Sequence, residues 1–239
     1  MRIAPLNFGC IHIVGIGGIG MSGIASILLS HGITVQGSDQ SDTKNVRALQ
    51  SQGVPIFFGH HAENIEGATV IACSSAIQKD NPEVQAAYKK GIPVLSRADL
   101  LAEVTRFYAT IAISGTHGKT TTTSLVAALL EAGGCDPTVI NGGIINSYGT
   151  NARIGHSHWL VVEADESDAT FSRIPLTIAL VTNIEAEHLE YYKSFENLKR
   201  HFIQYLKNIP FYGFGMVYGD HPTVQEVLQQ VPDRRIYTY

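Results

Sequence analysis

Short apolar runs alternate with stretches of helical spacing through the first part of the chain. Runs of apolar or β-branched residues predict strands at 11–14, 33–37, 54–58, 69–72 and 92–95. The stretches between them predict helices over 21–31, 44–52, 82–90 and 98–105. Strands that alternate with helices at this spacing are typical of a parallel sheet. The sequence therefore predicts an α/β domain over residues 1–105.

A second α/β pattern follows this domain. Apolar runs predict strands at 107–113, 159–163, 177–182, 215–218 and 235–239, and the stretches between them predict helices over 120–132, 195–207 and 222–230. The helix over 195–207 is amphipathic, and one side of it carries Phe195, Leu198, Phe202, Tyr205 and Leu206. We therefore predict a second domain over residues 106–239.

Composition excludes several classes of protein. Of the 239 residues, 44% are hydrophobic and 16% are charged, a balance that excludes an intrinsically disordered chain. With 17 basic against 21 acidic residues, the chain lacks the basic surplus of a generic nucleic-acid binder. Cys10, Cys73 and Cys135 lie far apart and form no CxxC pair, which argues against disulfides and zinc and favours reduced thiols in a cytoplasmic protein.

The N-terminal region carries no Asp, Glu, Lys or Arg between Arg2 and Asp39, and residues 8–29 are mostly apolar. A membrane span or a signal sequence is the competing interpretation of such a stretch. Six glycines cluster there, at positions 9, 15, 17, 18, 20 and 23. This cluster favours a loop and a short helix, so we expect no association with a membrane.

The first glycine loop has the pattern Gly15-x-Gly17-x-x-Gly20, and it follows a predicted strand and opens a predicted helix. In that context the glycines allow a tight turn and a close approach of the backbone to a phosphate at the helix N-terminus. Asp39 ends the second predicted strand, where a ribose hydroxyl is bound in such folds. The pattern favours a nucleotide site over a merely glycine-rich turn. It does not choose between NAD and another nucleotide, so an NAD(P)-dependent oxidoreductase remains an alternative.

The second glycine loop is a partial P-loop, with Gly115, Thr116, His117, Gly118, Lys119 and Thr120 between a strand and a helix. The usual pattern begins with a glycine at the position of Ile113, so the other glycine of this loop is shifted. Backbone N–H groups of such a loop surround phosphates, the lysine reaches the β- and γ-oxygens, and the hydroxyl binds Mg²⁺. We predict a P-loop-type ATPase domain rather than an unspecialised turn.

Acidic residues and a histidine follow two strands of the second domain. Glu163, Asp165, Glu166 and Asp168 come after one strand, and His188 lies among acidic residues after the next. Alone, each segment is typical of a solvated loop, but beside a P-loop a carboxylate at a strand end is a natural Mg²⁺ ligand. Four other histidines lack such a context and are predicted to be loop or surface residues: His60, His61, His156 and His158.

Five segments together resemble the Mur ligase family. They are GIGGIGMSG (15–23), SGTHGKTTTT (114–123), NGGIINSYGTNA (141–152), EADESDATF (163–171) and NIEAEHLEYY (183–192). The resemblance covers nearly the whole chain in collinear order. It implies a Rossmann-like N-terminal domain that binds a UDP-sugar, followed by a central ATP-binding domain.

The resemblance also implies a reaction. The motifs are similar to those of family members that join the lactyl carboxylate of UDP-N-acetylmuramate to L-alanine, with ATP and Mg²⁺, in peptidoglycan precursor synthesis. In that reaction the carboxylate attacks the γ-phosphate, and the amine then displaces phosphate from the acyl phosphate. A related murein-peptide ligase and a non-catalytic nucleotide-binding module are the alternatives. The oligomeric state is left open.

The resemblance implies roles for particular residues. The UDP-sugar would contact Gly15, Gly17, Gly18, Gly20, Ser38, Asp39, Ser74 and Ser75, with the loop of Gly142 and Gly143 against the substrate. ATP would contact Gly115, Thr116, His117, Gly118, Lys119, Thr120, Thr121 and Asn183. Lys119, Glu163 and His188 would be catalytic, and Thr120, Glu163 and His188 would hold Mg²⁺.

Two departures from the family pattern qualify this expectation. Glu187 and Glu190 stand where the family usually has aspartates, which keeps the charge and lengthens each side chain by a methylene. The family has about three domains, more than 239 residues accommodate. We therefore expect an incomplete central domain, no C-terminal ligase domain, weak substrate binding and little or no turnover by this chain alone.

Overall fold

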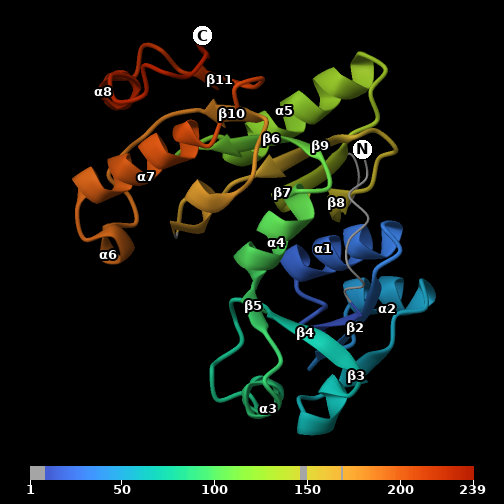
Figure 1. The fold of residues 1–239 in the computed structure, drawn as a ribbon. Helices are drawn as coiled ribbons and strands as arrows, with labels where there is room; N and C mark the ends of the chain where they lie inside the picture. Colours follow the sequence, from blue (N-terminus) through green and yellow to red (C-terminus); the bar gives the residue numbers. More distant parts are fainter. Residues whose placement is uncertain (1–8, 146–149, 168) are drawn as a thin grey trace. The chain divides into compact units, whose positions relative to one another are not determined.

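The structure, a computed structural model, describes residues 9–145, 150–167 and 169–239. The chain is mixed α/β and divides into two compact units, Met1–Val104 and Thr105–Tyr239, each built on one largely or entirely parallel sheet (Figure 1). Within the described ranges, no helix is both long enough and apolar enough to cross a bilayer.

The first unit is a five-stranded sheet in the order β3-β2-β1-β4-β5, with every neighbouring pair parallel. The strands are β1 (Cys10–Val14), β2 (Thr34–Asp39), β3 (Ile56–Phe58), β4 (Ala68–Cys73) and β5 (Val94–Ser96). The helices are α1 (Ile19–Ser30), α2 (Lys44–Ser51), η1 (Ala62–Ile65), α3 (Pro82–Lys90) and α4 (Arg97–Thr105). The parallel sheet is confirmed, and the predicted elements of this unit are found within a few residues of their expected bounds.

The register of β1 decides where the first glycine loop lies. Val14 at the end of β1 pairs with Ser38 of β2 on one side and with Cys73 of β4 on the other. The ends of these three neighbouring strands therefore lie side by side at one edge of the sheet, next to the turn into α1. Below that edge a core of buried side chains closes one face of the sheet, and it includes Val14, Ile65, Ala68, Ile71 and Ala87.

Local capping fixes the start of α3. The side chain of Asn81 accepts hydrogen bonds from the backbone N–H groups of Glu83 and Val84, and Pro82 occupies the first helical position. Gly91 ends the helix in the left-handed conformation, at φ +66°. This start places Glu83 in the first turn of α3, where its side chain is fully buried.

The second unit is a seven-stranded sheet in the order β12-β11-β10-β6-β9-β7-β8. Its strands are β6 (Ala109–Ser114), β7 (Thr138–Ile145), β8 (Thr150–Arg153), β9 (Trp159–Glu163), β10 (Ile178–Val181), β11 (Phe214–Val217) and β12 (Ile236–Thr238). Its helices are α5 (Lys119–Ala132), η2 (Ala169–Arg173), α6 (Leu189–Tyr192), α7 (Phe195–Lys207) and α8 (Pro222–Leu228). The predicted central strands lie side by side, because β6 pairs in parallel with both β9 and β10.

The strands β7 and β8 were not predicted. The segment with Gly142 and Gly143 was expected to be a loop, but the structure places both glycines in β7, which pairs antiparallel with β8. Glycines weaken a local strand signal, whereas pairing of Val139 and Ile140 with β9 is a tertiary effect. Both of these residues are buried, so the start of β7 belongs to the core of the unit.

The amphipathic helix over 195–207 is confirmed as α7. Leu198, Phe202, Tyr205 and Leu206 are buried and Phe195 is half-buried, as the pattern predicted. The Tyr205 hydroxyl donates a 2.6 Å hydrogen bond to the carbonyl oxygen of Ala112 in β6. This contact connects the helix to the strand that leads into the second glycine loop.

Candidate functional site

The second glycine loop connects β6 to α5 and needs a glycine at its first turn. Gly115 has φ +131°, and a Cβ atom built there would lie 2.1 Å from Oγ1 of Thr182. Gly118 has φ +82° at the N-cap of α5. Both positions therefore require glycine for backbone reasons, and Gly115 also requires it for steric reasons.

Residues after β10 hold this loop in place. The Asn183 side chain accepts from the N–H of His117 at 2.9 Å and donates to the carbonyl oxygen of the same residue at 3.1 Å. The Asn183 carbonyl accepts from the N–H of Thr116 at 3.0 Å, and Thr182 Oγ1 donates to the His117 carbonyl at 2.7 Å. The structure thus brings predicted ATP-site residues together, with Asn183 in direct contact with the loop.

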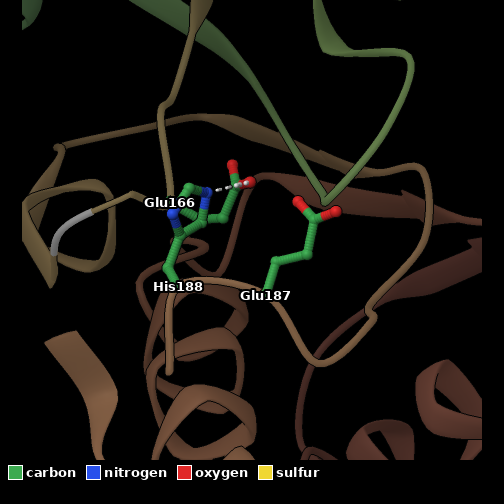
Figure 2. A group of neighbouring side chains, drawn as sticks. All are labelled: Glu166, Glu187 and His188. Carbon is green, nitrogen blue, oxygen red and sulfur yellow. Dashed lines mark ion pairs between the residues drawn. The ribbon is translucent and has the colours of Figure 1, made fainter. Parts of the chain in front are cut away.

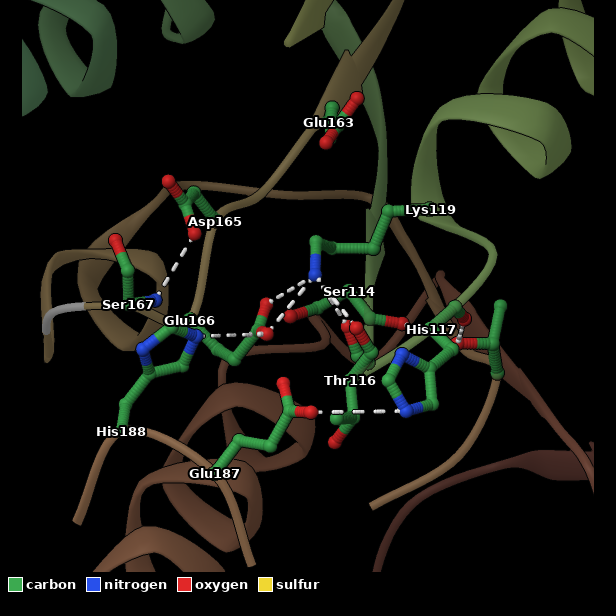
Figure 3. Close-up of polar contacts among 12 residues, drawn as sticks. Ser114, Thr116, His117, Lys119, Glu163, Asp165, Glu166, Ser167, Glu187 and His188 are labelled. Atoms are coloured by element: carbon green, nitrogen blue, oxygen red, sulfur yellow. Dashed lines mark hydrogen bonds and ion pairs between the residues drawn. The ribbon is translucent and has the colours of Figure 1, made fainter. Parts of the chain in front are cut away.

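Lys119 turns back over its own loop. Its Nζ donates to the carbonyl oxygens of Gly115 and Thr116, at 2.7 and 3.1 Å, and lies 2.7 Å from Oε2 of Glu166 (Figure 3). Glu166 is only 1% exposed. Burial raises the pKa of the Glu166 carboxyl, and the ammonium group of Lys119 opposes that shift. The ammonium group of Lys119 is therefore paired with a buried carboxylate beside the glycine loop.

Thr120 and Glu163 form the second feature of this loop. Thr120 Oγ1 donates to Oε2 of Glu163 at 3.0 Å. Two adjacent oxygen ligands of an octahedral Mg²⁺ lie about 3 Å apart, so these two oxygens fit one edge of such a site. Thr121 is exposed in the first turn of α5. The side chain of Asn141 donates to the Thr120 carbonyl at 3.3 Å, which supports the start of the helix.

A separate cluster lies beside Lys119 and consists of Glu166, Glu187 and His188 (Figure 2). One ligand atom from each residue lies within 4.8 Å of the others. His188 Nε2 lies 3.7 Å from Oε1 of Glu166, and His188 has φ +55°, a strained value for a non-glycine residue. The structure thus groups His188 with Glu166, whereas Glu163 is drawn apart from this cluster (Figure 3).

Glu187 faces two ways. Besides joining the cluster, its Oε1 lies 3.7 Å from Nε2 of His117, and Oε2 of Glu185 lies 3.6 Å from the same nitrogen. Glu187 is one of the two positions at which the sequence departs from the family pattern. Its longer side chain reaches the glycine loop. Asp168 of the acidic segment lies outside the described residues.

The first glycine loop, in the other unit, folds onto the end of β2. The carbonyl oxygen of Ser38 accepts from the N–H groups of Gly15 and Ile16, at 2.8 and 3.0 Å. Oδ2 of Asp39 accepts from the N–H of Gly17 at 2.8 Å. Three consecutive amides are therefore held by two residues of β2, and the loop is fixed before any ligand binds.

The remaining predicted UDP-sugar residues lie around this loop. A Cβ atom on Gly18 would lie 3.9 Å from Oγ of Ser74, and Ser75 is exposed beside it. A Cβ atom on Gly20 would lie 3.1 Å from Nη1 of Arg97. Ser38 is fully buried, so its side chain supports the loop from below. Gly142 and Gly143, which were predicted to lie against the substrate, belong to β7 of the second unit.

His60 lies in a loop as predicted, between β3 and η1, but its side chain turns inward. It is 10% exposed, and its Nδ1 lies 3.0 Å from a buried carboxylate oxygen of Glu83. His61, His156 and His158 are exposed as predicted. The sequence does not indicate which of the adjacent residues His60 and His61 turns inward, because the contact that decides it is with Glu83, 23 residues from His60.

Sequence reasoning did not single out Glu166, Arg97 or Glu83. Glu166 is one of four acidic residues in a short segment, and only its burial beside Lys119 distinguishes it. Arg97 follows β5 and reaches Gly20, a contact between distant segments. Of these three residues, the sequence pointed only toward Glu166, because the acidic segment that contains it was predicted as a candidate Mg²⁺ site.

Family comparisons cover both units. The profile of the Mur ligase family, catalytic domain, matches residues 10–109, and that of the Mur ligase middle domain matches residues 113–239. The chain is 59% identical over 235 residues to UDP-N-acetylmuramate–L-alanine ligases of Brucella anthropi and Brucella ovis. These matches include 98% of this chain and 50% of each relative, so the chain spans about half the length of the curated relatives it matches.

Two solved structures share the fold. A UDP-N-acetylmuramate:L-alanyl-γ-D-glutamyl-meso-diaminopimelate ligase of Neisseria meningitides superposes with a TM-score of 0.85 at 26% identity, over 97% of this chain and 78% of that one. The UDP-N-acetylmuramate–alanine ligase of Thermotoga maritima superposes with a TM-score of 0.80 at 32% identity, over 92% of this chain and 51% of that one.

Proposed function

Because the chain belongs to the Mur ligase family, we propose that its two units carry the UDP-sugar and ATP sites of a ligase that joins L-alanine to UDP-N-acetylmuramate. The reaction serves peptidoglycan precursor synthesis. The observation that carries the proposal is the pairing of Lys119 with a buried carboxylate at the mouth of a phosphate-binding loop. The 59% identity to L-alanine ligases supports the choice of substrates.

In this proposal the second unit binds ATP. The loop from Gly115 to Thr120 surrounds the phosphates with backbone N–H groups, and the dipole of α5 favours their negative charge. When ATP binds, Lys119 would leave Glu166 and contact the γ-phosphate oxygens. Its positive charge there would offset the negative charge that develops during phosphoryl transfer. Asn183 holds His117 and with it the shape of the loop.

Thr120 and Glu163 would hold a Mg²⁺ ion, and the cluster of Glu166, Glu187 and His188 would hold a second one. Such ions neutralise phosphate charge and orient the phosphates for in-line attack. Oxygen ligands suit Mg²⁺ at both places, and the single imidazole at the second is a ligand that Mn²⁺ also accepts.

The chemistry consists of two displacements. A lactyl carboxylate oxygen of the UDP-sugar attacks the γ-phosphorus, the bond to the β-phosphate oxygen breaks, and ADP leaves. The amine of L-alanine then attacks the acyl carbon, inorganic phosphate leaves, and the amine proton passes to solvent or to a nearby base. The chain's own contribution to the first step is the position of Lys119.

The first unit would bind the UDP part. A diphosphate placed at the loop meets the N-terminal end of α1, where the helix dipole is positive, and the side chain of Arg97 beside Gly20. Ser74 adds a hydroxyl near Gly18. A murein-peptide ligase is the second candidate, supported by the fold similarity to the Neisseria enzyme at 26% identity.

Calorimetric titration with ATP tests the proposal at the second unit. We expect binding in the presence of Mg²⁺, and binding at least about tenfold weaker in EDTA, because the metal neutralises phosphate charge. ADP formation in the presence of UDP-N-acetylmuramate distinguishes the two candidates, with L-alanine as the amine in one arm and the peptide L-alanyl-γ-D-glutamyl-meso-diaminopimelate in the other. Absence of ATP binding with Mg²⁺ present would contradict both.

A further inference from the structure

A fully buried carboxylate lies beneath the first glycine loop. Glu83 in α3 is 0% exposed, and four side chains from separate segments face it. Its Oε2 accepts from Oγ of Ser38 at 2.7 Å and lies 3.0 Å from Nδ1 of His60. Its Oε1 accepts from Nδ2 of Asn64 at 2.6 Å and lies 3.6 Å from Nε2 of His12. The carboxylate therefore accepts hydrogen bonds from Ser38 and Asn64 and has an imidazole nitrogen near each of its oxygens.

Such a group is costly as a packing element. A carboxylate taken out of water loses several kcal/mol of hydration, and apolar residues of similar volume often stabilise a fold better than buried polar networks do. Removing any one donor leaves a buried charge without its full set of partners. The network thus specifies a geometry, and Ser38 is the member that connects it to the candidate site.

Ser38 is attached at both ends. Its hydroxyl is held by Glu83, and its carbonyl oxygen accepts the N–H groups of Gly15 and Ile16. The loop has no comparable attachment through side chains of its own first residues, because Gly15 has none and Ile16 is apolar. The position of the Ser38 backbone therefore determines where the turn of the loop lies.

The arrangement of Ser38, His60 and Glu83 does not make a nucleophile. Ser38 is fully buried, and the same imidazole nitrogen, Nδ1 of His60, faces both the hydroxyl and the carboxylate. A hydroxyl activated for attack needs an exposed oxygen and a base that uses its second nitrogen for the carboxylate. The network is a support and not a second active centre.

We infer that Glu83 is a positioning residue for the UDP-sugar site: through Ser38 it fixes the anion-binding loop at Gly15 and Ile16. The inference rests on the proposed function for the identity of the ligand, but not for the structural connection. Glu83 itself touches no ligand in this proposal. Its substitution changes the affinity of the first unit and leaves the second unit unchanged.

Two variants test this connection, Glu83→Gln and Ser38→Ala, with exposed Glu63→Gln as the matched control. UDP-N-acetylmuramate and Mg·ATP are titrated separately into each protein, at a temperature well below its melting point. We expect Glu83→Gln to weaken the binding of UDP-N-acetylmuramate by about tenfold, the scale of one hydrogen bond lost. ATP affinity and the control variant should match the wild type.

The double variant separates positioning from general destabilisation. If Glu83 acts through Ser38, adding Ser38→Ala to Glu83→Gln weakens binding by less than about twofold further, because coupled residues are not additive. Independent, additive losses would overturn the inference, as would wild-type affinity in Glu83→Gln. Loss of ATP binding in Glu83→Gln would also overturn it, since a local support in the first unit leaves the second intact.

A ligand-free measurement keeps the inference apart from the proposed function. Backbone amide hydrogen exchange at Gly15 and Ile16 reports the two bonds to the Ser38 carbonyl directly. We expect faster exchange at both amides in Glu83→Gln and in Ser38→Ala than in the wild type. Unchanged exchange would overturn the inference. Failure of the wild type to bind UDP-N-acetylmuramate would contradict the proposed ligand alone.

Discussion

The ammonium group of Lys119 lies 2.7 Å from the carboxylate of Glu166, which is 1% exposed. The two residues are 47 positions apart and belong to the start of α5 and to the segment after β9. A lysine that is already paired, and that also donates to its own loop, is held in one position beside that loop. This contact connects the glycine loop to the acidic segment in one site.

Replacing Lys119 tests its role toward phosphate. We expect Lys119→Met to weaken the binding of Mg·ATP about 10- to 100-fold, since a hydrogen bond to a charged group contributes roughly 1.5–3 kcal/mol. Calorimetry measures the change. Lys193→Met, at an exposed lysine of the same unit, is the control and should bind ATP as the wild type does. Equal affinities for Lys119→Met and wild type would exclude the predicted contact.

The contact between Thr120 and Glu163 predicts a shared Mg²⁺ ion. Thr120→Val and Glu163→Gln should each raise the Mg²⁺ concentration needed for half-maximal ATP binding, by about tenfold. The double variant should be little worse than the poorer single variant, because each substitution removes a ligand of the same ion. A Mg²⁺ titration at fixed ATP gives these values, and fully additive shifts would argue for two unrelated effects.

Gly115 offers a steric test with an internal control. A methyl group at Gly115 meets Oγ1 of Thr182 at 2.1 Å, whereas one at Gly134, also at positive φ, has no atom within 4 Å. We expect Gly134→Ala to cost about 1 kcal/mol of unfolding free energy from backbone strain alone. Gly115→Ala should cost more and abolish ATP binding.

Urea denaturation and ATP titration measure both effects. Equal destabilisation of the two variants, with ATP binding retained in both, would mean that the loop adapts to the added methyl group.

The acid side of the stability profile tests the charge on Glu83. Burial alone would raise the pKa of the Glu83 carboxyl, but the nearby imidazole of His12 and the hydrogen bonds from Ser38 and Asn64 outweigh it and hold the pKa below its ordinary value of 4.5. The folded state then binds fewer protons than the unfolded state. The stabilisation is fully present above the ordinary pKa and is lost as the pH falls through the lower, folded value.

The free energy of unfolding should therefore differ most between wild type and Glu83→Gln near about pH 7, and the difference should shrink below about pH 4. Chemical denaturation at a series of pH values measures it. Exposed Glu63→Gln should show no such trend. A constant difference across the series would contradict a lowered pKa for Glu83.

The sequence was sufficient for the elements whose pattern is local. The strand and helix around Gly15 follow from apolar runs and glycine spacing, as do β6 and α5 around Lys119. The strand β7 was missed because its glycines resemble a loop, and its pairing with β9 is decided by packing between distant segments.

The site was predictable to the level of segments and not of individual side chains. The acidic segment after β9 was expected near the P-loop, but only folding selects Glu166 as the buried partner of Lys119. The contact of Ser38 with Glu83 spans 45 residues, and no spacing rule connects a strand end to the first turn of a later helix. Such contacts depend on tertiary structure and need coordinates.

The measurement that tests the central claim most directly is a calorimetric titration of this chain with UDP-N-acetylmuramate, with NADH as the control ligand. The account predicts binding of the UDP-sugar and no binding of NADH, because the first glycine loop is proposed to hold a UDP diphosphate. Binding of NADH without binding of UDP-N-acetylmuramate would contradict it.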